Sequence, residues 1–79
     1  MPTLDQLRPG QRGCITAVDG ADGLVQRLME MGILEGEWVE VVGVAPLGDP
    51  IDVRLGDYRL SLRRNEARRV QVTSAQTEG

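Results

Sequence analysis

Apolar and polar side chains alternate along most of this chain, in short segments that glycine and proline separate. Alternation with a period of two is typical of strands that bury one face. Five segments alternate in this way or are rich in β-branched residues: residues 13–18, 38–45, 51–55, 58–62 and 69–72. Gly56 and Asp57 fit a two-residue hairpin turn between the third and fourth segments, and Gly43 fits a bulge. The pattern therefore predicts five short strands.

One segment, from Asp22 to Gly32, has the spacing of a helix instead. Leu24, Leu28 and Met31 recur at i, i+4 and i+7 and form an apolar stripe. Asp22 fits the N-cap, and Gly32 fits the left-handed residue that ends many helices. A helix this short is not stable alone. We therefore expect its stripe to pack against the sheet.

Two single helical turns complete the predicted elements, one beginning at Leu4 and one within residues 63–67. Five strands, one hairpin and one short helix in 79 residues favour a mainly β fold. The best match is a small SH3-like β-barrel of about five strands with one short inserted α-helix. A chain of this length forms one domain, which we expect at residues 1–73. Residues 74–79 have no apolar anchor, so we expect a mobile C-terminal tail.

The composition removes most groups that usually perform catalysis. The chain has no His, no Lys, one Cys (Cys14) and two Ser, and His is the only side chain whose ordinary pKa lies near neutrality. We therefore predict that the protein is not an enzyme and has no catalytic residue. Composition alone does not exclude acid–base catalysis by two carboxylates, or a hard cation bound by a cluster of carboxylates.

The sequence predicts neither a metal site nor a segment that inserts into a membrane. Asp49 and Asp52 form a close pair of acids at a loop, but carboxylates bind weakly unless several converge. We expect no cofactor and no metal site, with iron or another divalent metal bound only weakly or adventitiously. The lone Cys, the lack of a signal-like N-terminus and the absence of a long apolar run predict a cytoplasmic protein without direct membrane insertion.

Charge is distributed unevenly along the chain. Residues 1–53 hold nine acids and three Arg, a net charge of −6, whereas residues 54–72 hold six Arg and two acids, a net charge of +4. The asymmetry fits a surface for an acidic partner, anionic lipid or nucleic acid. It equally fits ion pairs across the sheet, with Arg54 or Arg59 opposite Glu40 or Asp52. We favour the second interpretation.

Nucleic-acid binding is the alternative function, because small barrels often bind RNA or DNA. The chain contains a basic cluster: Arg63, Arg64, Arg68 and Arg69. Against this alternative, the chain is acidic overall and offers only Trp38 and Tyr58 to stack on bases. We therefore expect no nucleic-acid partner.

Four spaced motifs, in this order, resemble a single family: RLMEMGI at residues 27–33, EG at 35–36, APLGDP at 45–50 and LSLRRNEA at 60–67. Together they are similar to the FeoA family, from about Leu4 to Val72. The resemblance implies an SH3-like barrel with an inserted helix. It also implies a cytosolic accessory protein of bacterial ferrous iron transport that binds the cytosolic side of the FeoB transporter and modulates its activity. Edge pairing between short strands leaves a homo-oligomer open.

Five residues are candidates for partner binding: Arg27, Met29, Met31, Trp38 and Leu47. Adaptable Met side chains recur on interaction surfaces, although a helix of this kind also buries such residues in a core. Trp38 is expected either outside the barrel, as an interface anchor, or under the helix. Leu47 lies in a proline-rich loop that either contacts a partner or only connects two strands.

Overall fold

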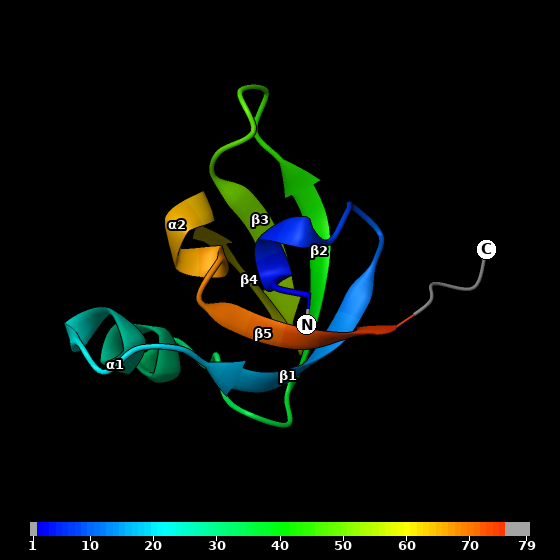
Figure 1. The fold of residues 1–79 in the computed structure, drawn as a ribbon. Coiled ribbons are helices and arrows are strands. Elements are labelled where there is room, and N and C mark those ends of the chain that lie inside the picture. Colours follow the sequence, from blue (N-terminus) through cyan, green and yellow to red (C-terminus); the bar gives the residue numbers. More distant parts are fainter. Residues whose placement is uncertain (1, 76–79) are drawn as a thin grey trace.

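The strands of the computed structural model form one antiparallel sheet, and the structure describes residues 2–75 (Figure 1). The five strands within these residues are β1 (Arg12–Val18), β2 (Trp38–Val44), β3 (Ile51–Leu55), β4 (Tyr58–Leu62) and β5 (Val70–Ala75). Their order in the sheet is β4-β3-β2-β1-β5. Each predicted segment is therefore a strand, with ends that differ from prediction by no more than three residues.

Three helical elements connect or cover the strands: the 3₁₀ turn η1 (Leu4–Gln6), the helix α1 (Gly23–Glu30) and the one-turn helix α2 (Arg64–Ala67). Figure 1 shows α1 projecting to one side of the sheet, while η1 and α2 lie close to the strands. The prediction of a small SH3-like barrel with one inserted α-helix is confirmed. None of the helices in residues 2–75 is long and apolar enough to cross a membrane.

The predicted hairpin and bulge are both present. β3 and β4 pair in register from Ile51 opposite Leu62 to Leu55 opposite Tyr58, so two residues form the turn. The register between β2 and β3 shifts between Val41 and Gly43. Bulges of this kind increase the local twist of a strand, which helps a short sheet to curve.

The core lies inside the curved sheet, and the inward residues of the strands alternate as predicted. Val39 and Val41 of β2 are both buried, and Leu28 of α1 is fully buried beneath the helix. Leu24 and Met31 are partly buried and pack against the same core, which confirms the predicted stripe. The buried apolar residues are Leu4, Leu7, Ile15, Leu28, Ile33, Val39, Val41, Ile51, Val53, Leu55, Leu62, Ala67, Val70 and Val72.

The free edge of β5 is covered by the start of the chain. The backbone N–H of Val72 donates to the carbonyl oxygen of Pro2 at 3.0 Å, and Thr3 forms an antiparallel bridge with Gln71. This pairing protects an edge that would otherwise expose backbone groups. β5 continues to Ala75, three residues beyond its predicted end. The rest of the predicted tail, residues 76–79, lies outside the described residues.

Candidate interaction surface

The N-terminal end of α1 is attached by a polar contact to the turn that precedes β5. Asp22 occupies the N-cap position as predicted, but its Oδ1 accepts a hydrogen bond from Nη1 of Arg69 at 2.9 Å. That hydrogen bond lowers the pKa of the Asp22 carboxyl below its ordinary value of 3.8. Asp22 therefore anchors the start of α1 to the turn between α2 and β5, through the side chain of Arg69.

The middle of α1 is attached to α2 through Arg27. Nη2 of Arg27 lies 2.8 Å from Oε2 of Glu66, whose side chain is only 8% exposed. The other oxygen of Glu66 accepts a hydrogen bond from the backbone N–H of Arg63 at 2.8 Å. Arg27, predicted as a partner-binding residue, thus also has an internal structural role. Glu66 lies three residues after the N-cap, where an acid commonly accepts this hydrogen bond.

The C-terminal end of α1 is held by Tyr58. From the sequence, the only functional role considered for this residue was stacking on nucleic-acid bases. The hydroxyl of Tyr58 donates a hydrogen bond to the carbonyl oxygen of Met31 at 2.5 Å. Met31 itself is partly buried against the core. Its side chain is therefore less available to a partner than that of Met29.

Met29 faces outward from α1 and is 47% exposed. It borders an open groove of about 340 Å³ between α1 and β1, lined by Thr16, Ala17, Val18, Met29, Ile33 and Glu35. Most of these side chains are apolar. Met29 is therefore the predicted residue on α1 that is best placed to contact another protein. We call Met29 and this groove the α1 surface.

Trp38 lies on the outside of the sheet and is 49% exposed, which decides between the two predicted positions. The guanidinium carbon of Arg12 lies 5.5 Å from the centroid of its ring, in cation–π contact.

Beside Trp38, Arg54 pairs with Glu40 at 2.5 Å across the β2–β3 ladder. This pair, like that of Arg59 with Asp52 at 2.6 Å, confirms the predicted ion pairs across the sheet.

Leu47 is 96% exposed, and the other exposed large apolar side chains of residues 2–75 are 37–49% exposed. It lies in the loop of residues 45–50 between β2 and β3, which we call the Leu47 loop. In Figure 1 this loop, at the top, and α1, at the lower left, lie far apart. The structure therefore divides the predicted partner-binding residues between separate surfaces.

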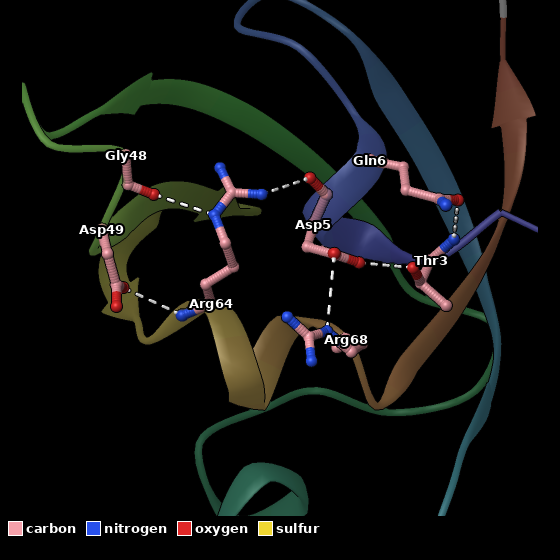
Figure 2. Close-up of polar contacts among 7 residues, drawn as sticks. All are labelled: Thr3, Asp5, Gln6, Gly48, Asp49, Arg64 and Arg68. Atoms are coloured by element: carbon pink, nitrogen blue, oxygen red, sulfur yellow. Dashed lines mark hydrogen bonds and ion pairs between the residues drawn. The ribbon is translucent and has the colours of Figure 1, made fainter.

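Most of the predicted basic cluster has internal partners (Figure 2). Nε of Arg64 donates to the carbonyl oxygen of Gly48 at 3.0 Å, and its Nη1 donates to that of Asp5 at 3.1 Å. Nε of Arg68 lies 4.0 Å from Oδ2 of Asp5, and Arg69 is paired as described above. These contacts leave fewer free cations for a phosphate backbone than the sequence indicates.

The two acids considered for a metal site are also engaged within the chain. Oδ1 of Asp49 accepts a hydrogen bond from the backbone N–H of Arg64 at 2.9 Å, and Asp52 is paired with Arg59. Residues 2–75 contain no group of three or more His, Cys, Asp or Glu side chains arranged to hold a metal ion. The carboxylates of Asp49 and Asp52 thus already have partners within the chain.

Comparison with known proteins agrees with this fold. The family model for the FeoA domain matches residues 3–74. A curated relative, the fusion of Fe(2+) transport protein A with the Fe(2+) transporter FeoB from Porphyromonas gingivalis, is 39% identical over 69 residues. The match covers 87% of this chain, but the chain spans only 8% of that relative's length.

Solved structures of similar proteins have the same architecture. The FeoA-like protein from Clostridium acetobutylicum is 30% identical, with a TM-score of 0.90 over 98% of this chain and 90% of that one. FeoA from Stenotrophomonas maltophilia, solved with zinc, is 34% identical, with a TM-score of 0.81 over 92% and 91%. The latter is described as an SH3 domain protein and a candidate activating factor for ferrous iron transport.

Proposed function

Since the chain belongs to the FeoA family, which is associated with ferrous iron transport, we propose that it is a non-enzymatic accessory protein of that process. It acts in the cytoplasm, binds the cytosolic side of a FeoB-type transporter and modulates the transporter's activity. It needs no resident cofactor, and iron or another divalent metal binds it only weakly. The α1 surface is one of the surfaces that contact the transporter.

The relative in which the two proteins form one polypeptide supports the partner. Fusion holds two modules at a high effective concentration, which is useful when the modules bind each other. An FeoA-type domain joined to FeoB therefore supports a direct contact between the separate proteins.

The observation that carries the proposal is the half-exposed Met29 beside an apolar groove. An amphipathic helix with an exposed apolar residue offers a partner a surface that buries well. The three polar attachments of α1 hold this surface in one orientation before binding. Preorganisation of this kind lowers the entropy lost on association.

A binding experiment with matched variants tests the proposal. Met29→Ala shortens the exposed apolar side chain, and Gln26→Ala changes an exposed polar residue on the same helix. We expect Met29→Ala to weaken binding to the detergent-solubilised FeoB-type transporter and to reduce anaerobic ferrous iron uptake. Gln26→Ala should match wild type in both assays. Failure of the wild-type protein to bind the transporter would refute the proposal.

A further inference from the structure

The Leu47 loop has a fixed backbone although its apolar side chain has almost no internal contact. The N–H of Gly48 donates to the carbonyl oxygen of Ala45 at 2.7 Å, and the N–H of Ala45 donates to that of Pro50 at 3.0 Å. Pro46 and Pro50 further restrict the backbone. A single exposed leucine is ordinary in proteins. One held at the tip of a hydrogen-bonded loop is presented in a defined position.

The side chain of Arg64 lies between this loop and η1, as Figure 2 shows. Its Nε donates to the carbonyl oxygen of Gly48 at 3.0 Å, and its backbone N–H donates to Oδ1 of Asp49 at 2.9 Å. Both contacted residues directly follow Leu47 in the chain. Arg64 therefore restrains the segment that carries the exposed leucine, through both its half-buried side chain and its backbone.

The other end of the Arg64 side chain is fixed to the core. Its Nη1 donates to the carbonyl oxygen of Asp5 at 3.1 Å, and Asp5 belongs to η1, in which Leu4 is fully buried. A planar guanidinium can donate to two separate carbonyl oxygens at once, whereas an ammonium group on a flexible stem holds such a geometry poorly. Arg64 thus links the Leu47 loop to a rigid part of the molecule.

Arg64 restrains the loop without covering its apolar side chain. Here it fixes the backbone on the C-terminal side of Leu47 and leaves that side chain 96% exposed. The benefit of such rigidity arises when a partner buries the leucine, because less conformational freedom is then lost on binding. The apolar character of the residue indicates an apolar pocket as its receptor.

Resting on the proposed function, we infer that Leu47 is a second anchor for the transporter, inserting into an apolar pocket on its cytosolic part, and that Arg64 is the residue that positions it. This contact lies far from α1 (Figure 1). Arg64 acts only through the loop and does not itself need to touch the partner.

The test measures affinity for the detergent-solubilised FeoB-type transporter by titration with purified variants. Leu47→Ala should weaken binding about tenfold or more, since a buried leucine contributes on that scale. Leu47→Met keeps an apolar side chain of similar volume and should retain most of the affinity. Arg64→Lys should weaken binding several-fold, and the exposed neighbour Arg63→Lys should not.

A double-mutant cycle separates positioning from a structural role. If Arg64 acts through Leu47, Arg64→Lys should cause little further loss of affinity in the Leu47→Ala background. Arg64→Lys should also accelerate hydrogen exchange of the Gly48 amide in the free protein. The melting temperature should stay high enough for the variant to remain folded under the conditions of the measurement.

The outcomes distinguish this inference from the proposed function. Wild-type affinity in Leu47→Ala, with weakened binding in Met29→Ala, refutes the second anchor and leaves the transporter as partner. Additive losses in the double mutant refute the positioning role of Arg64. Absence of binding by the wild-type protein refutes both proposals together.

Discussion

The hydroxyl of Tyr58 occupies the space that a side chain at Gly32 would need. A Cβ atom built at Gly32 would lie 2.0 Å from this oxygen, and the backbone φ of Gly32 is +102°. The space is used instead for the hydrogen bond from Tyr58 to the carbonyl oxygen of Met31. The β3–β4 hairpin and the end of α1 are thereby locked together.

Gly32→Ala is therefore expected to reduce the free energy of unfolding for two reasons, backbone strain and a steric clash. Gly36→Ala is the matched control, because Gly36 has a φ of +92° and nothing within 4 Å of a built Cβ. We expect about 1 kcal/mol of loss for Gly36→Ala and clearly more for Gly32→Ala. Urea unfolding measures both. Equal losses would show that the Tyr58 contact is unimportant.

Tyr58→Phe should cost about 0.5–1.5 kcal/mol, the net value of one hydrogen bond. In the Gly32→Ala background the same change removes the clashing oxygen, so its effect should become smaller or change sign. Unfolding free energies of the two single variants and the double variant provide the test. Strict additivity would contradict the close approach seen in the structure.

Arg27→Ala should destabilise the fold more than an ordinary surface change does. It leaves the Glu66 carboxylate, 8% exposed, without its cationic partner, and we expect a loss of about 1–2 kcal/mol. Arg59→Ala breaks the more exposed pair with Asp52 and should cost less than about 1 kcal/mol. Comparable values for the two variants, measured by thermal and urea unfolding, would argue against a structural role for Arg27.

The pair of Asp22 with Arg69 predicts a pH dependence of stability. The pKa of Asp22 is lowered in the folded state, so the folded protein binds this proton less tightly than the unfolded chain does. The resulting stabilisation is present above the ordinary pKa of 3.8 and is lost as the pH falls through the lowered value.

Comparison with Asp22→Asn isolates this contribution, because other acids titrate in the same range. The stability difference between wild type and the variant should be largest near neutral pH and should shrink below about pH 4. Unfolding curves collected from pH 7 to pH 2 provide the measurement. A difference that stays constant with pH would rule out the proposed linkage.

Val41→Ala tests the core separately from the surfaces. Val41 is fully buried, and its truncation should cost about 1–3 kcal/mol through lost packing. Val44→Ala, at a position 37% exposed in the same strand, should change stability by less than about 0.5 kcal/mol. At temperatures where both are folded, each should bind the transporter as wild type does.

Local pattern was sufficient to predict the elements of this fold. The alternation in β3 and β4 fixed their register, and the spacing of Leu24 and Leu28 identified the buried face of α1. Even the pair of Arg54 with Glu40 was predictable, because it follows from two neighbouring strands. These features depend on residues close in sequence or on simple strand pairing.

The candidate site was less predictable, because it depends on contacts that the complete fold creates. Arg27 meets Glu66 across 39 positions of sequence, and Arg64 reaches Asp5 across 59. No periodicity indicates either contact. Sequence reasoning therefore grouped the partner-binding candidates as one set, whereas the fold places α1 and the Leu47 loop far apart.

If the α1 surface and the Leu47 loop both contact the transporter as proposed, their separation has a consequence for how its activity is controlled. A small rigid domain with two separated contact surfaces can bind through both only when the two binding sites on its partner are correctly spaced. Such a molecule recognises a shape of the transporter rather than a single patch, and by mass action it enriches whichever shape satisfies both contacts.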